Sequence, residues 1–207
     1  MEVLVAATLT MIVAFAIMGF FDAQQRAYAT LSTYAESQHV TRTAIDLMAR
    51  EIRMASYNPL GTALTTCPVP TCAVATGEGI YEARPGRIRI RQDLTNNGTI
   101  NAANEDVIYE QQGTTIVRTD VFMNQALTLV DNVSANGLRF TYYWNTPMTL
   151  LSPSGSPSQL TQTQRGLVDK VRIQIQAAVP NSYPGQPAVD SVVRSTVAVR
   201  NRSIGSF

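Results

Sequence analysis

Residues 3–21 read VLVAATLTMIVAFAIMGFF, an apolar run without a single charged side chain. As an α-helix this run is about 28 Å long, close to the roughly 30 Å hydrocarbon core of a bilayer. No Lys or Arg precedes it, and its one A-x-A pattern, at residues 14–16, lies in mid-span. A cleaved signal peptide needs a basic start and a cleavage site after a shorter apolar core. The run therefore favours a membrane-spanning helix over a signal peptide.

The chain that follows keeps a helical pattern. Residues 22–57 contain no proline and no glycine, and apolar residues recur at steps of three and four, the spacing of one helix face. This apolar stripe consists of Leu31, Tyr34, Ile45, Met48, Ile52 and Ala55. The stripe is interrupted between Glu36 and Arg42, and Asn58-Pro59 is a typical helix end. We expect one helix over residues 2–57, about 80 Å long, with an apolar first half and an amphipathic second half.

The composition is nearly neutral and poor in charge. The 207 residues are 45% hydrophobic and 15% charged, with a net charge of +1. This hydrophobic content excludes a disordered chain, and the net charge gives no whole-chain electrostatic reason to bind nucleic acid. One histidine and two cysteines leave little for a zinc cluster or a histidine-based triad. We also find no nucleophile–base pair and no phosphate loop, so we expect no enzymatic activity.

Residues 58–207 change from helical spacing to alternation with a period of two. In RIRIR, at residues 87–91, the isoleucines face one side and the arginines the other. The other strand candidates are residues 106–110, 115–118, 138–144, 171–179 and 191–200. One-sided alternation favours an antiparallel sheet with one apolar face, which the stripe of the helix would cover. We expect an α+β fold with a long N-terminal helix over residues 1–57, packed on an antiparallel β-sheet head over residues 58–207.

The apolar helix, together with EVLVA at residues 2–6, resembles the type IV pilin family, which includes the pseudopilins of type II secretion. Members carry the motif G-F-T-L-x-E ahead of an apolar helix, and residues 1–4 match its end. TRTAIDLMAREIRMASYNP at residues 41–59 resembles the PilW-like minor pilins and, more distantly, the J-type minor pseudopilins. VDNVSANGLRFTYY at 130–143 and VAVRN at 197–201 are similar to later strands of this group. The resemblance implies the pilin fold.

The resemblance also implies roles for single residues. Glu2 corresponds to the family glutamate that pairs with the N-terminal amine of a neighbouring subunit during assembly. From physics alone, Glu2 is a helix N-terminal acid that the helix dipole stabilises. Gly19 lies in the apolar segment where many members have a helix-breaking proline, and both local melting and close helix packing stay open there. The motif residues before Met1 have no counterpart, so no cleavage or methylation position is assigned.

Cys67 and Cys72 lie in TCPVPTC, a loop with two prolines. In an extracytoplasmic domain we expect them to form a local disulfide. A redox-active pair is less favoured because the C-x-x-C spacing is absent, and two free thiols are the remaining alternative.

DLTNNGTINAANED, at residues 93–106, has the oxygen spacing of a calcium loop followed by a turn glycine, Gly98. The candidate ligands are Asp93, Thr95, Asn97, Thr99, Asn101 and Glu105. Position twelve of the loop is Asn104 rather than glutamate, so Glu105 or Asp106 would have to reach in. The same Asn-Asn-Gly run is also a good hairpin turn, and calcium is therefore a possible cofactor against a purely structural alternative.

The arginines at 87, 89 and 91 could form a basic stripe with Arg172, Arg194, Arg200 or Arg202. A solvated strand face explains the same residues, and no interleaved aromatic residues support base stacking. We therefore do not expect nucleic acid as a partner.

The resemblance implies a structural role. The chain would be a minor pilin of a type IV pilus, a single-pass inner-membrane protein with a periplasmic head that then enters a cell-surface filament. The implied partners are other minor and major pilins, a tip adhesin and the inner-membrane assembly platform, with a role in priming assembly near the tip. A J-type minor pseudopilin of a type II secretion system is the alternative within the family. A membrane-anchored periplasmic ligand-binding module is the alternative of another class.

Overall fold

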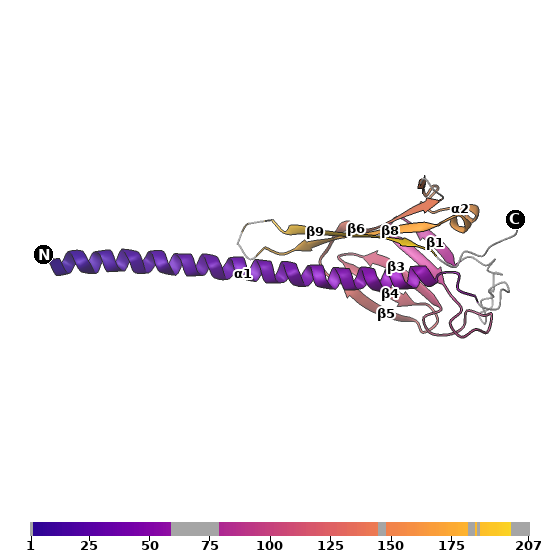
Figure 1. Ribbon diagram of the computed structural model, residues 1–207, viewed down its shortest axis with the longest axis horizontal. Coiled ribbons are helices and arrows are strands. Elements are labelled where there is room, and N and C mark those ends of the chain that lie inside the picture. The colour runs from indigo at the N-terminus through magenta and orange to yellow at the C-terminus, as the bar shows by residue number, and fades with distance from the viewer. Residues whose placement is uncertain (1, 59–78, 145–147, 182–184, 186, 200–207) are drawn as a thin grey trace.

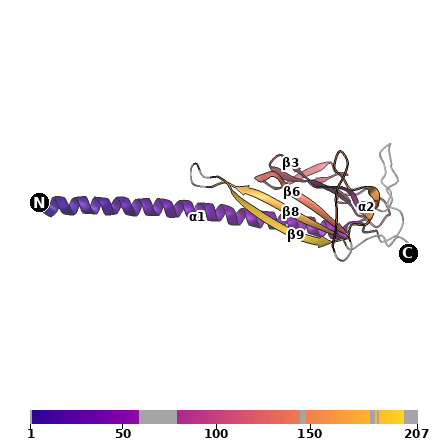
Figure 2. The same cartoon turned by 90° about the horizontal axis from the view of Figure 1, so that it is seen from above.

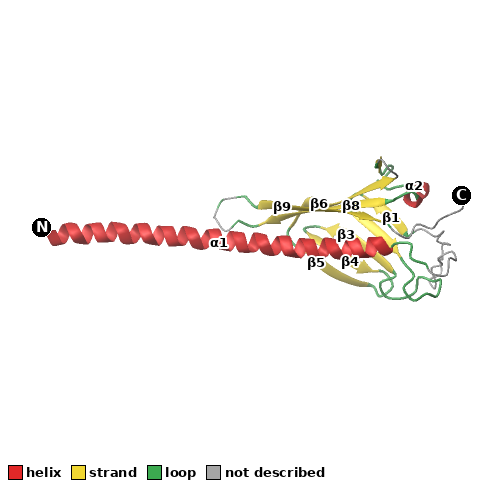
Figure 3. Ribbon diagram, viewed as in Figure 1, coloured by secondary structure: helices red, strands yellow, loops and turns green. Residues whose placement is uncertain are grey.

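A long helix, α1 (Glu2–Met54), leads into a β-sheet head and projects far beyond it (Figure 1). The computed structural model describes residues 2–58, 79–144, 148–181, 185 and 187–199. All paired strands in these residues are antiparallel. The expected α+β class, with an apolar N-terminal helix and an antiparallel head, is confirmed (Figure 3).

The helix is continuous through the segment where the apolar stripe is interrupted. The Gln38 side-chain amide donates to the Tyr34 hydroxyl at 2.8 Å, and Arg42 donates to Gln38 at 3.4 Å. These contacts are spaced four residues apart, so polar side chains link successive turns where apolar contacts are missing.

The helix ends at Met54 rather than at the expected Tyr57. Ser56 adopts a left-handed conformation, with φ of 66°, which ends helical geometry before the Asn-Pro sequence is reached. The Ser56 N–H donates to the carbonyl of Arg91 at 3.0 Å, and its hydroxyl accepts from the Gly79 N–H at 2.8 Å. The end of the helix is therefore tied to strand β2 (Arg87–Arg91) and to the start of strand β1 (Ile80–Arg84).

The head contains two sheets where the sequence predicts one. The first has the order β1-β2-β3-β4-β5, and the second has the order β7-β6-β8-β9. The strands of the first sheet are Ile80–Arg84, Arg87–Arg91, Asp106–Gln112, Thr115–Asp120 and Gln125–Val130. Those of the second are β6 (Val133–Trp144), β7 (Thr149–Leu151), β8 (Lys170–Val179) and β9 (Val189–Ala198). A short helix, α2 (Gln162–Gly166), begins at the capping residue Thr161.

The two sheets diverge, and the second half of α1 lies between them (Figure 1). Their inner faces join the helix in one hydrophobic core, so both patterns of one-sided alternation point at the same helix. Met48 and Ile52 on the helix, Ile88 on β2 and Ile173 on β8 are all fully buried in this core. The end of α1 is therefore an interior part of the head.

The head covers less of α1 than the apolar stripe predicts. Leu31 is 64% exposed, and the first buried residue of the helix is Thr41. The two sheets do not reach the first turns of the stripe, which leaves Leu31 outside the core.

Strand β6 begins with an irregular segment that requires a glycine. Register shifts between Val133 and Leu138, and Asn136 has a positive φ of 56°. A Cβ atom on Gly137 would lie 2.5 Å from the backbone oxygen of Gln176 on β8. The two backbones approach too closely here for any other residue.

Replacing Gly137 with alanine should destabilise the head by about 1–3 kcal/mol, because backbone atoms must move to admit the methyl group. Denaturant unfolding of the full chain in detergent measures this. Gly166→Ala is the matched control, because no atom lies within 4 Å of its Cβ position, and it should change stability by less than about 0.5 kcal/mol. Equal stability of the two variants would contradict the close approach at Gly137.

Candidate functional site

The N-terminal half of α1 is an apolar surface that the head leaves uncovered. Residues 2–25 are all exposed, and the head buries no part of the most apolar stretch of the helix. The large apolar side chains here include Leu4, Ile12, Phe15 and Phe20. Length and composition suit a membrane anchor, and a signal sequence passes the same test.

Two candidate residues lie on this apolar half. Glu2 is exposed in the first turn of α1 and has no hydrogen bond or ion pair among the described residues. The helix runs through Gly19 without a break, and local melting at Gly19 stays a prediction. A Cβ atom on Gly19 would meet nothing within 4 Å. Close packing at Gly19 thus needs a second chain and stays a prediction.

The candidate calcium residues do come together in one loop, between β2 and β3. The Asp93 carboxylate accepts the N–H groups of Asn97 at 3.2 Å and Gly98 at 2.8 Å. The Asn97 side-chain oxygen accepts from the N–H and hydroxyl of Thr99, and its amide nitrogen donates to Asn101. These are the contacts of a tight polar turn.

Glu105 is the centre of this loop and is fully buried. One carboxylate oxygen accepts from the N–H groups of Leu94 and Thr95 and from the Thr95 hydroxyl, at 2.9–3.0 Å. The other accepts from the N–H groups of Asn101 and Ala102. A calcium ion would have to displace these donors. The described residues contain no group of three or more acidic, histidine or cysteine residues that could hold a metal. Calcium binding stays a prediction.

The disulfide prediction falls on Cys67 and Cys72, which lie outside the described residues. Arg200 and Arg202, two members of the expected basic stripe, also lie outside them.

A charged contact holds α1 against the inner face of the first sheet. Arg118 on β4 donates to Glu51 of the helix at 2.7 and 3.1 Å, and the Tyr109 hydroxyl on β3 donates to the same carboxylate at 2.6 Å. The side chains of Glu51 and Arg118 are each only 12% exposed. We call these three residues the helix clamp. It fixes both the position and the rotation of α1 on the sheet.

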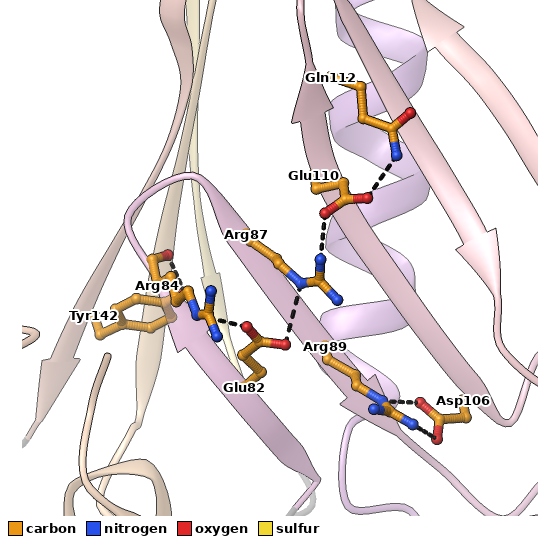
Figure 4. Close-up of polar contacts among 8 residues, drawn as sticks. All are labelled: Glu82, Arg84, Arg87, Arg89, Asp106, Glu110, Gln112 and Tyr142. Atoms are coloured by element: carbon orange, nitrogen blue, oxygen red, sulfur yellow. Dashed lines mark hydrogen bonds and ion pairs between the residues drawn. The ribbon is translucent and has the colours of Figure 1, made fainter. Parts of the chain in front are cut away.

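The outer face of β1, β2 and β3 carries two groups of ion pairs, one around Arg87 and one around Asp106 (Figure 4). Arg87 binds Glu82 at 3.1 Å and also binds Glu110, which accepts from Gln112 as well. Arg84 and Glu82 lie 2.6 Å apart as an ion pair, although without the angle of a hydrogen bond. We call this surface the ion-pair face. Its members are Glu82, Arg84, Arg87, Arg89, Arg91, Asp106 and Glu110.

Two arginines of this face share one carboxylate. Arg89 contacts both oxygens of Asp106 at 2.7 Å, and Arg91 contacts one of them at 3.0 Å. Both guanidinium groups also lie over the ring of Tyr81. Burial opposes the charge of Arg89, but its bonds to Asp106 outweigh burial and raise its pKa. Burial lowers the pKa of Arg91, and the neighbouring charge of Arg89 adds to this.

The structure divides the expected basic stripe between two sheets. The arginines at 87, 89 and 91 are neutralised on the first sheet, whereas Arg172 and Arg194 lie on β8 and β9 of the second. They do not form one surface, because the two sheets are separate.

Sequence reasoning missed the helix clamp and the pairing of the ion-pair face. Glu51 sits between the buried positions Met48 and Ile52, so an acid flanking a buried stripe was a usable signal. The acids at 82, 106 and 110 lie on neighbouring strands, and only the strand register shows which arginine each one meets.

No protein-family model matches the chain, and neither curated proteins nor solved structures show a significant similarity to it.

Replacing Glu51 with glutamine should lower stability by about 2 kcal/mol, because Arg118 loses its charged partner in a largely buried position. Denaturant unfolding of the full chain in detergent measures this. Asp46→Asn, at an exposed acid on the same helix, is the control and should shift stability by less than about 0.5 kcal/mol. If both variants unfold at the same denaturant concentration, the clamp contributes nothing.

Stability should also fall at high pH. Burial, then the negative charge of Glu51, raises the pKa of Tyr109, and burial raises the pKa of Tyr142. Unfolded tyrosines ionise near pH 10, so above about pH 10 the unfolded chain releases protons that the folded chain keeps. The stabilisation is complete below about pH 10 and declines above it. Unfolding midpoints between pH 9 and 12 measure the decline, and Tyr109→Phe should make it shallower. A flat profile in the wild-type chain would be inconsistent with protonated buried tyrosines.

Proposed function

We propose that this chain is a type IV pilin-like minor subunit, with the pilin fold, whose apolar half-helix lies first in the inner membrane and then among other helices in a filament core. The proposal covers the partners that the sequence resemblance implies: other minor and major pilins, a tip adhesin and the assembly platform. A minor pilin of a type IV pilus is the form we favour, and a J-type pseudopilin is the alternative within the family. The role is structural.

The observation that supports the proposal is the division of α1 into two halves. Twelve large apolar side chains between Val3 and Phe21 are exposed. At about 2 kcal/mol for each, leaving them in water costs on the order of 20 kcal/mol, so they require a lipid or protein cover. The same helix continues without interruption into the core of the head. A cleaved signal peptide needs no such continuity, whereas a subunit that moves from lipid into a filament requires a rigid link between both halves.

The expected role of Glu2 depends on what surrounds the apolar half of α1. Once the apolar half is surrounded by lipid or by other helices, an unpaired carboxylate becomes costly, and a cationic partner offsets much of that cost. The described residues offer Glu2 no such partner within the chain. A neighbouring subunit would have to supply it.

Replacing Glu2 with alanine should reduce the amount of this chain in sheared filaments at least tenfold, while membrane insertion is unchanged. Immunoblots of filament and membrane fractions measure both quantities. Asp22→Ala is the matched control. Asp22 lies at the other end of the apolar run, and its exposed pair with Arg26, at 2.8 Å, is expected to contribute little.

Two outcomes would count against the proposal in different ways. Normal incorporation of the Glu2→Ala chain contradicts the charge pairing at Glu2. Absence of the wild-type chain from filaments, with the head still exported, contradicts the filament function and favours a membrane-anchored binding module.

A further inference from the structure

The outer face of the second sheet carries four cations that no carboxylate in the described part of the head neutralises. By strand alternation and register, Arg139 on β6, Lys170 and Arg172 on β8 and Arg194 on β9 all point away from the core. We call this surface the basic face. Figure 2 views the molecule from this side, with β8 and β9 crossing in front of α1.

Carboxylates are absent from the centre of the basic face, as far as the described residues show. None of its four cations takes part in an ion pair there. Arg194 donates to the Gln174 side chain at 2.9 Å, and Arg172 lies 5.0 Å from the centre of the Tyr143 ring. Among the described residues, Asp190 is the acid that strand alternation places on this face, and it accepts from Gln176. It lies four residues from Arg194, about 13 Å along the strand.

The arginines of the first sheet are paired with carboxylates, and this difference indicates that the cations of the basic face are available to a partner. On the ion-pair face, each of the four arginines contacts a carboxylate within 3.1 Å. On the basic face, Arg139 and Arg194 are exposed to solvent. Four like charges within three adjacent rows of a sheet repel one another, and an anionic partner would relieve that repulsion.

A hollow of opposite charge lies elsewhere on the same chain. It has a volume of about 220 Å³ and opens between α1, the β5–β6 turn and the end of β8. Glu36 of α1 and Asp131 of the turn line it, together with Asn132 and Val179. Both acids are exposed, and neither has an ion-pair partner among the described residues. We call this hollow the acidic notch.

We propose that the acidic notch of one copy of this chain receives the basic face of a second copy. The signs are opposite, the notch is large enough to admit an arginine side chain, and guanidinium groups bind carboxylates with two parallel hydrogen bonds. The basic face turns away from α1, whereas the notch opens against α1, so the two cannot meet within one chain. Their contact joins two different surfaces, and such heterologous contacts form rings or helical filaments. The contact goes beyond the proposed function, because it needs two copies of this chain and does not need an assembled filament.

The test uses charge reversal in the full chain, reconstituted in lipid vesicles and labelled at the C-terminus with donor or acceptor dyes. Energy transfer at increasing protein density reports association between copies. Reversing the face with Arg139→Glu and Arg194→Glu, or the notch with Glu36→Arg and Asp131→Arg, should weaken association about tenfold. Arg50→Glu with Arg53→Glu, two exposed helix positions, is the control with the same charge change as the face reversal and should leave association unaltered.

Mixing the two reversed variants is the decisive measurement. A face-reversed copy and a notch-reversed copy carry complementary surfaces again, so the mixture should recover wild-type association. If the mixture does not recover, or if the face-reversed variant associates as the wild type does, the proposal is wrong. If a reversed variant melts below the wild type, Arg139→Gln with Arg194→Gln takes its place, and unchanged association then overturns the proposal too.

Two further measurements distinguish this contact from nucleic-acid binding and from the pairing of Glu2. Fluorescence anisotropy with a single-stranded oligonucleotide tests a nucleic-acid ligand. Oligonucleotide binding that the face reversal abolishes, with association unchanged, would overturn the proposal and assign the face to a polyanion. Glu2→Ala should leave association intact, because Glu2 lies about 50 Å along the helix from Glu36. Failure of the filament function at Glu2 is therefore distinguishable from failure of this contact.

Discussion

The packing of the second half of α1 between two sheets is the contact on which the head depends. The inner faces of both sheets point at this helix, and without it Ile88, Ile173 and their neighbours would lose their shared cover. The helix clamp adds a directional element that hydrophobic packing lacks, because Glu51 must face Arg118 and Tyr109. A rotation of α1 by one residue, about 100°, would bury charge and expose Met48. Since the helix is continuous, the clamp also sets which side each residue of the apolar half presents.

Polar groups perform three different tasks in the head. Glu105 and Asp93 organise a loop by accepting backbone N–H groups, so their charge is used inside the chain. The ion-pair face neutralises its own arginines, with Asp106 serving two of them. The basic face and the acidic notch keep their charges available to solvent. The net charge of +1 therefore does not mean that the surface is uniformly neutral. Some charges are paired within the head, and the basic face and the acidic notch carry opposite charges in separate places.

The sequence predicted the elements whose periodicity is strong and missed what depends on register. The apolar run, the long helix and strands such as Arg87–Arg91 follow from local spacing, and the structure confirms them. The end of the helix was misplaced because Ser56 takes a conformation that its residue type does not announce. The single expected sheet became two because alternation tells which face is apolar but does not tell which strands are neighbours.

The candidate site shows the same limit. The sequence alone identifies Glu2 as a candidate, because it is a charged residue directly before an uncharged apolar run. Spacing alone predicts the six calcium candidates, and they do share one loop, yet spacing does not show that backbone N–H groups already surround Glu105. Arginines that look alike in sequence have different surroundings. The strand register places Asp106 beside Arg89, whereas no acid in the described part of the chain pairs with Arg139.

The unbroken course of α1 has a mechanical consequence. Strands β8 and β9 lie alongside the buried part of the helix (Figure 1). A pull on the N-terminus, directed along the helix axis, therefore loads their contact in shear, so that the buried side chains and the Glu51 clamp resist together. A pull across the axis would instead peel the contacts apart in succession. The packing of the head on α1 therefore resists tension that is applied along the axis of this helix.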